Sequence, residues 1–115
     1  MSEGVSVPPG HIVCPECSEP TYAWGRGGSK QFCSPKCRMA FHARAKVEGA
    51  AIIALAKVWR RNRGSGETAR EAFAEMVRIL DSFTTADIAA GRPNPTDYVK
   101  RLLSSGYRYM DRRRS

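Results

Sequence analysis

Residues 32–38 read FCSPKCR and residues 14–17 read CPEC, and these two stretches hold all four cysteines of the 115-residue chain. Their full spacing is C-x2-C-x15-C-x3-C. A two-residue gap lets a tight turn aim two sulfurs at one point, and positions four apart lie on the same face of a helix. Paired spacings of this kind are typical of a tetrahedral site with four thiolates. The sequence therefore predicts one structural zinc ion, with the ligands Cys14, Cys17, Cys33 and Cys37.

Three alternatives remain open for these cysteines: two disulfides, a redox-active CxxC pair, and unliganded thiols. MSEGVSVPPGH, residues 1–11, lacks the basic and hydrophobic regions of a secretory signal, so the cytoplasm is the expected compartment. Disulfides are disfavoured there. A redox pair normally begins a helix in a βαβ setting, which Pro15 and Glu16 do not have. Because four protein ligands leave no open coordination position, the zinc would be structural rather than catalytic.

A hairpin and then a long helix are predicted around the second cysteine pair. Aromatic residues alternate with small ones in TYAWGRGGSKQF, residues 21–32, before a glycine-rich turn, as in a β-hairpin. Ser34 is a preferred N-cap residue, and Pro35 suits the first helical position because no N–H is needed there. We expect this helix to run through Arg63, with Gly49 as a weak point in its middle.

Two further helices are expected in the C-terminal half. TARE, residues 68–71, has the form of a capping box. TADIAAG, residues 85–91, is expected to form at most a short helical turn, because glycine and proline follow it. A last helix is expected from a Thr96 cap through Leu103. The first of these helices has an apolar stripe that needs a surface to pack on: Ala69, Phe73, Met76, Val77, Leu80 and Phe83.

These elements predict a small α+β fold. A zinc-bound knuckle and a β-hairpin lead into a long helix, followed by a helical C-terminal region. We expect a flexible arm at residues 1–12 and a four-cysteine zinc module at residues 13–45. A helical region at residues 46–105 and a basic tail at residues 106–115 complete the predicted organisation.

The cysteine stretches and the Trp-Gly hairpin between them resemble a treble-clef zinc finger of the FCS type. In particular, residues 14–37 are similar to the short zinc-finger inhibitors of bacterial DNA gyrase, which share this spacing and a tryptophan in the hairpin. The resemblance implies that the four cysteines ligate zinc, that Ser34 caps the helix, and that gyrase is an expected target. Two features differ from that family. Ser18 replaces the usual glycine after the knuckle, and RMAFHARAK continues into a long helix where the family has an Asp-Leu-Gly stretch.

The net charge of +8 is distributed unevenly. Residues 38–63 hold seven basic side chains and one acidic, and residues 98–115 hold six basic and one acidic. Residues 64–97 hold three basic and six acidic. Four thiolates and a zinc dication contribute −2, so the zinc-loaded chain keeps about +6. Two basic patches favour an acidic partner, most commonly nucleic acid.

Basic residues of the first long helix gather on one face, because five of them fall within a sector of about 120° at 100° per residue. We expect them to contact the phosphate backbone of DNA or RNA rather than to read bases. A solvated helix face, with cations favoured near the helix C-terminus, is the alternative. The residues predicted to bind nucleic acid are Arg38, Lys46, Lys57, Arg60, Arg61, Arg63, Arg112, Arg113 and Arg114. The packing face of the same helix is expected to be Ala40, Val47, Ala51, Leu55 and Val58.

Catalysis is not expected, because the chain has no nucleophile elbow, P-loop or paired-carboxylate motif. His42 lies off the helix face that carries the Cys37 sulfur and is expected to be a surface residue. The longest apolar run, AAIIALA at residues 50–56, is too short to span a membrane. We therefore expect a non-enzymatic, regulatory protein that binds nucleic acid and has neither a membrane partner nor a small-molecule substrate. The alternative is an adaptor or inhibitor that binds an acidic protein surface.

Overall fold

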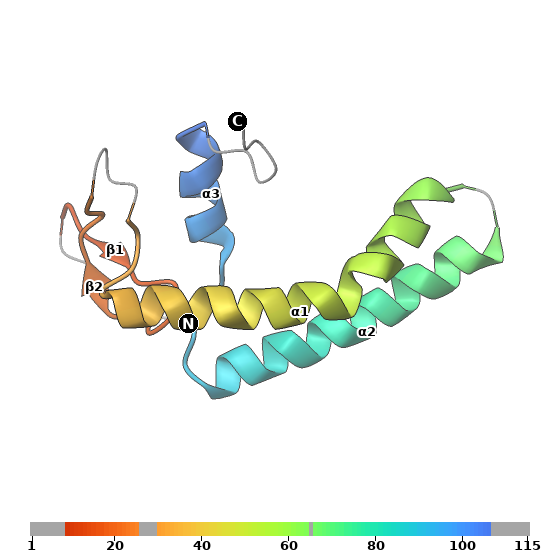
Figure 1. The fold of residues 1–115 in the computed structure, drawn as a ribbon, viewed down its shortest axis with the longest axis horizontal. Helices are drawn as coiled ribbons and strands as arrows, with labels where there is room; N and C mark the ends of the chain where they lie inside the picture. Colours follow the sequence, from red (N-terminus) through yellow and green to blue (C-terminus); the bar gives the residue numbers. More distant parts are fainter. Residues whose placement is uncertain (1–8, 26–29, 65, 107–115) are drawn as a thin grey trace.

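The computed structural model describes residues 9–25, 30–64 and 66–106, in which short strands precede three helices (Figure 1). β1 (Ile12–Val13) and β2 (Pro20–Thr21) pair antiparallel. They are followed by α1 (Pro35–Arg61), α2 (Glu67–Ala89) and α3 (Thr96–Ser104). α1 and α2 form a long antiparallel helical hairpin, and α3 stands beside the cysteine-containing end of α1 (Figure 1). The predicted small α+β fold is confirmed.

β1 and β2 flank the turn that carries the first cysteine pair. The Cys14 N–H donates to the Glu19 carbonyl at 2.9 Å, and the Ser18 N–H donates to the Cys14 carbonyl at 3.0 Å. Ser18 has a φ of 69°, in the left-handed region that favours glycine. Serine adopts this conformation less readily than glycine would. Here the Ser18 hydroxyl also donates to the Gly91 carbonyl at 2.7 Å, which ties the turn to the residues after α2.

The hairpin predicted over residues 21–32 is only partly present. Trp24 and Lys30 form one antiparallel bridge, with backbone hydrogen bonds of 2.7 and 2.6 Å, and the turn at residues 26–29 lies outside the described residues. The Trp24 indole N–H donates to the Phe32 carbonyl at 2.5 Å, which holds this segment close to the start of α1. The paired strands form instead on either side of the knuckle, where Val13 pairs with Pro20 and Ile12 pairs with Thr21.

α1 begins as predicted. Ser34 is the N-cap with a φ of −160°, its hydroxyl accepts from the Cys37 N–H at 3.2 Å, and Pro35 is the first helical residue. The helix ends at Arg61 rather than Arg63, because the Asn62 side chain and backbone both bond to the Val58 carbonyl as a C-terminal cap. α1 bends in its C-terminal, yellow-green part (Figure 1).

Three boundary predictions for the later helices were wrong. Thr68 does not cap α2, which begins at Glu67 after Gly66, so the capping box does not form. Residues 85–89 continue α2 to Ala89, because alanine and isoleucine support helix there and the glycine stop comes only afterwards. Thr96 is the first residue of α3, and its backbone N–H is bound at 2.9 Å by the side-chain oxygen of Asn94.

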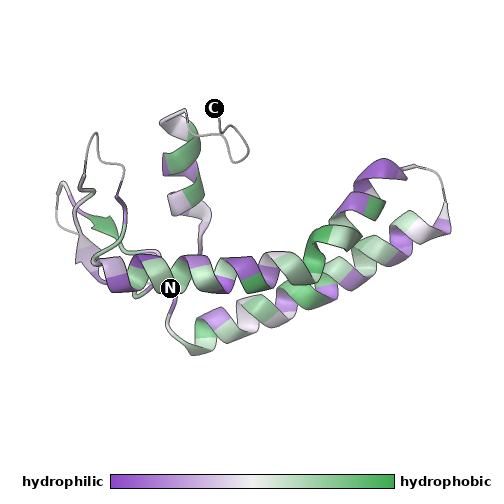
Figure 2. Ribbon diagram, in the orientation of Figure 1, coloured by the Kyte–Doolittle hydropathy of each residue, from purple (hydrophilic) through white to green (hydrophobic). Residues whose placement is uncertain are grey.

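The packing face predicted for α1 is confirmed only in its C-terminal part. Ala40, Val47 and Ala51 are exposed, Val47 by 72%, whereas Leu55 and Val58 are half-buried as expected. No residue of α1 is fully buried, and the side that lies inward consists of half-buried residues. Within the helical hairpin, strongly hydrophobic ribbon segments lie where the C-terminal half of α1 faces α2 (Figure 2). Half-buried residues of α1 beyond the first turn include Phe41, Arg44, Glu48, Ile52, Leu55, Val58 and Trp59.

The apolar stripe of α2 divides into two parts. Ala69 and Met76 are buried together with Ala72, and Phe83 is half-buried, so these residues form the contact with α1. The other three residues of the stripe stay partly open along one flank of α2: Phe73 (46% exposed), Val77 (38%) and Leu80 (40%). Ile88 (73%), which was not part of the predicted stripe, continues the same flank. This exposed flank is not explained by packing within the described chain.

A second small core joins the cysteine-containing end to α3. Phe32 is 3% exposed, and the Phe41 and Tyr98 rings lie against it with centroid distances of 5.1 and 5.7 Å. The Arg101 guanidinium donates to the Gln31 side chain at 2.5 Å. These contacts hold α3 over the start of α1. Within the described residues, no helix has both the length and the apolar composition needed to cross a bilayer.

Candidate metal centre and cationic surface

The sulfur atoms of all four cysteines lie close together around one point. Cys14 and Cys17 come from the knuckle and Cys33 and Cys37 from the start of α1, and the four sulfurs lie within 4.8 Å of one another. The Cys33 sulfur is 3.5 Å from those of Cys17 and Cys37. A zinc ion with Zn–S bonds of about 2.3 Å needs sulfurs about 3.8 Å apart at tetrahedral corners. The cluster therefore fits one four-coordinate metal ion, as predicted.

The four cysteines of this cluster do not form disulfide bonds. The cysteines are free thiols, and sulfur separations of 3.5 Å far exceed the roughly 2.05 Å of an S–S bond. Cys33 lies equally far from two other sulfurs, so no pairing of the four into separate bridges is favoured. Four soft ligands around one point are the donor set that zinc prefers.

The pKa values of three of the clustered thiols are shifted, and not all in the same direction. Burial, reinforced by the neighbouring thiols, raises the pKa of Cys17 to about 12. Burial also raises the pKa of the Cys37 thiol. Burial acts in the same direction at Cys14, but backbone N–H groups, first that of Cys33, outweigh it and lower the pKa of Cys14. A divalent cation would supply the charge that allows four thiolates to coexist.

The knuckle is fixed to α1 by an ion pair that the sequence pattern did not indicate. Arg44 donates to both carboxylate oxygens of Glu16, at 2.9 and 2.5 Å, and lies 3.9 Å from Glu48 one helical turn further on. The hydrogen bond from Arg44 to Glu16 raises the pKa of Arg44. A charged residue four positions before another on a helix was the available signal for the Arg44–Glu48 contact. The contact with Glu16 needed the tertiary structure.

His42 is exposed and lies edge-on to the Phe32 and Phe41 rings, at 5.7 and 5.4 Å between centroids. It does not belong to the cysteine cluster. The interpretation of His42 as a surface residue of the helix agrees with this position.

The basic residues predicted to bind nucleic acid fall into three groups: exposed, half-buried, and outside the described residues. Five of them are exposed on α1 or just after it: Lys46, Lys57, Arg60, Arg61 and Arg63. Arg38 is half-buried beside the metal centre, and its Nε is buried without a hydrogen-bond partner. Residues 112–114, the predicted terminal arginines, lie outside the described residues.

The exposed cations are not neutralised by carboxylates of the described chain. Among the described residues, the arginines in ion pairs are Arg44, Arg78 and Arg92, and none belongs to the predicted set. Four of the five exposed cations cluster at the end of α1 that is remote from the cysteines: Lys57, Arg60, Arg61 and Arg63. We call these four residues the cationic end of α1.

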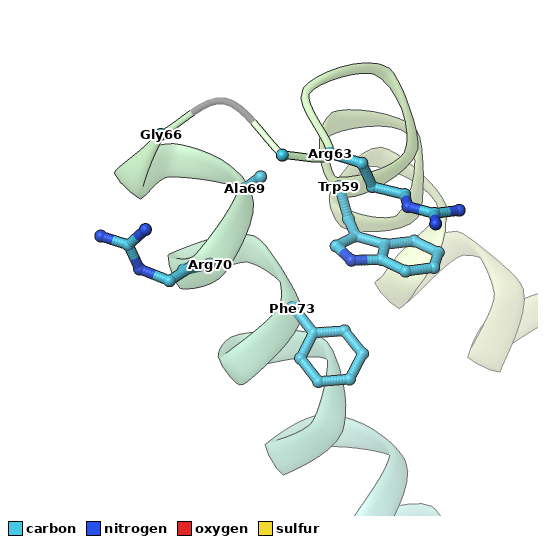
Figure 3. A pocket seen from close by; sticks show the side chains of 7 residues that line it. Trp59, Arg63, Gly66, Ala69, Arg70 and Phe73 are labelled. Atoms are coloured by element: carbon cyan, nitrogen blue, oxygen red, sulfur yellow. The ribbon is translucent and has the colours of Figure 1, made fainter.

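A groove of about 580 Å³ lies at the tip of the α1–α2 hairpin, beside the cationic end (Figure 3). Two aromatic residues, Trp59 and Phe73, and two arginines, Arg63 and Arg70, line it together with the small residues of the helix connection. The Arg63 guanidinium lies 5.3 Å from the centre of the Trp59 ring. Arg70 was not predicted as a functional residue; it lies in the segment of residues 64–97, where acidic side chains outnumber basic ones.

Comparisons with protein-family models, curated proteins and solved structures gave no match to this chain. The similarity to the zinc-finger inhibitors of gyrase therefore rests on the residue pattern of the cysteine stretches.

Proposed function

We propose that this chain is a non-enzymatic, regulatory protein that binds the phosphate backbone of DNA or RNA through the cationic end of α1, with zinc as a structural ion. The observation that carries the proposal is the cluster of exposed cations without carboxylate partners in the described part of the chain. Basic residues that merely solvate a helix face commonly pair with acids three or four positions away. Phosphate oxygens are well suited to neutralise unpaired arginines.

The zinc site supports a scaffold role in this proposal. Four thiolates occupy every position of a tetrahedral ion, so neither water nor substrate is activated by the metal. The order of knuckle, Trp24–Lys30 bridge and helix, with ligands from the knuckle and from the helix start, supports a treble-clef arrangement. Four reduced thiolates also suit a cytoplasmic location.

The test is the salt dependence of binding by the zinc-loaded chain to random-sequence duplex DNA, single-stranded DNA and RNA. If the cationic end makes three phosphate contacts, log K against log salt for the duplex has a slope of about −2.7. Lys57→Gln combined with Arg60→Gln is expected to weaken binding to all sequences and to reduce the slope by almost 2.

The matched control removes the same charge elsewhere. Arg78→Gln combined with Lys100→Gln also lowers the net charge by two, at exposed positions on α2 and α3. Equal losses from both double variants would mean that only net charge matters and would contradict a specific surface. If the zinc-loaded chain bound neither DNA nor RNA at low salt, the proposal would be wrong.

A second candidate is an adaptor or inhibitor that binds an acidic protein, as the gyrase-inhibitor resemblance suggests. The exposed apolar flank of α2, with Phe73 and Leu80, favours it, because such a stripe is suited to dock on a partner. The nearby cationic end would make that partner acidic by charge complementarity. Tight binding to one acidic protein with weak salt dependence, lost on Leu80→Asp, would support this candidate over nucleic acid.

A further inference from the structure

The aromatic side chains that line the groove at the hairpin tip remain partly exposed to solvent. The Trp59 and Phe73 rings lie 5.7 Å apart at an angle of 35°, and Phe73 remains 46% exposed. Figure 3 shows both rings on one side of the tip, with Arg63 extending beside Trp59 and Arg70 extending away in another direction. A flat apolar surface is therefore available next to the Arg63 guanidinium, and Arg70 also lines the groove.

The charge around this surface is of one sign. Arg63 and Arg70 line the groove, and no carboxylate of the described residues does. Glu67 and Glu71 are exposed on the same helix, but they are rotated by about 120° and 160° from Phe73 at 100° per residue. The acidic residues of α2 thus leave the groove itself positive.

We propose that this tip groove, defined by Trp59, Arg63, Arg70 and Phe73, binds an unpaired nucleobase of single-stranded nucleic acid. The base stacks on the open Phe73 ring, and the flanking phosphates contact Arg63 and Arg70. The inference rests on the proposed function, because it assigns to the same nucleic-acid surface a preference for single strands.

Three physical points support this assignment. A volume of about 580 Å³ is within the range of ligand clefts. Aromatic platforms beside cations are the usual means of binding single strands without sequence preference, because every base has a flat face. A paired base in a duplex is already stacked on both sides and cannot reach Phe73 without being flipped out, so duplex binding gains nothing from the ring.

The experiment compares the affinity of the zinc-loaded full chain for oligothymidylate, oligouridylate and a random-sequence duplex. Phe73→Leu keeps an apolar side chain but removes the flat ring, and the expected result is a loss of about fivefold or more for both single strands. Duplex affinity should stay unchanged. Phe73→Tyr keeps the ring and should retain full affinity.

Leu80→Ala is the matched control, because Leu80 lies on the same flank of α2 with 40% exposure but does not line the groove. It should change neither affinity. Arg70→Gln should weaken single-strand binding, whereas Arg78→Gln, on the same helix and outside the groove, should not. Oligothymidylate against oligouridylate separates DNA from RNA as the preferred strand.

Trp59 gives a second readout that needs no change at Phe73. Stacking beside it should quench its fluorescence with oligothymidylate but not with inorganic polyphosphate, and Trp59→Phe should abolish that change while Trp24 continues to emit. Single-strand binding that Phe73→Leu leaves intact would overturn the stacking site while the phosphate-binding function stands. Equal losses for single strands and duplex would overturn it in the same way. Failure to bind any nucleic acid would instead end the proposed function itself.

Discussion

Arg44 on α1 and Glu16 in the knuckle form a two-point ion pair, with contacts of 2.9 and 2.5 Å. The two side chains are only 24% and 15% exposed. The pair joins the turn that carries the first two cysteines to the helix that carries the last. It therefore helps to hold all four sulfurs around one point in the folded protein.

Breaking this pair should destabilise the zinc-loaded protein. Glu16→Gln and Arg44→Met should show a coupling of about 1.5 kcal/mol in a double-mutant cycle, the range of hydrogen bonds to charged groups. The measurement is the free energy of unfolding from denaturant titrations. Glu75 and Arg78 form an exposed pair within α2 and serve as the control, for which no measurable coupling is expected. Equal coupling for both pairs would contradict the role given to Arg44.

Loss of one ligand should unfold the zinc module rather than merely weaken it. Cys37→Ser, or removal of the metal by a chelator, should abolish fixed structure across residues 13–45, because the free energy of metal binding is part of the free energy of folding. Native mass spectrometry should show one zinc per chain before and none after, and hydrogen exchange should locate the loss. Ser34→Ala keeps all four ligands and should retain zinc at a cost of about 1 kcal/mol. Full protection of the metal-free chain would contradict this prediction.

Zinc binding at pH 7 should release at least two protons. An ordinary thiol has a pKa above 7, and burial in the folded cluster raises the pKa of Cys17 to about 12 and also raises that of Cys37, so both thiols carry protons at pH 7 whether or not the module is folded. Both must lose their protons to ligate zinc, so affinity should increase with pH. Calorimetry in buffers of different ionisation enthalpy counts the protons. A binding enthalpy independent of the buffer would contradict the release of protons from these thiols.

Tyr98 should hold α3 in place. Tyr98→Ala removes ring contacts with Phe32 and Phe41 and should cost about 1–3 kcal/mol locally. A helix of nine residues is not stable alone, so hydrogen exchange across Thr96–Ser104 should accelerate while zinc stays bound. Leu103→Ala, on the same helix with 50% exposure, should have little effect. Unchanged protection in Tyr98→Ala would show that other contacts hold α3.

Local rules account for the parts of the chain that were predicted well. Cysteine spacing predicted the metal centre, because ligand geometry at a turn and at a helix start depends on a few neighbouring residues. Ser34 and Pro35 placed the start of α1, since a cap acts on the N–H groups of its own first turn. The capping box at Thr68 predicted the wrong start for α2, because a capping pattern expresses only a local preference. The N-cap of α2 is Gly66, directly before Glu67.

The hydrophobic pattern of α1 did not predict which residues face inward where those residues are polar. Val47 points to solvent while Arg44 and Glu48 face inward, because the ion pair with Glu16 makes polar side chains suitable at the junction of knuckle and helix. An alanine-rich helix has little apolar contrast around its circumference, so periodicity alone could not orient it. Arg38 was grouped with the exposed cations for the same reason, yet it is half-buried.

The sequence by itself determined the ligand set, the start of the long helix and the excess of positive charge, since each depends on residue type and short-range spacing. Only the tertiary structure decided which face of α1 meets α2, which cations stay unpaired among the described residues, and that Trp59, Arg63, Arg70 and Phe73 line one groove. Those relationships join residues from different elements. Their positions depend on how the helices pack, and packing is a property of the whole chain rather than of any stretch within it.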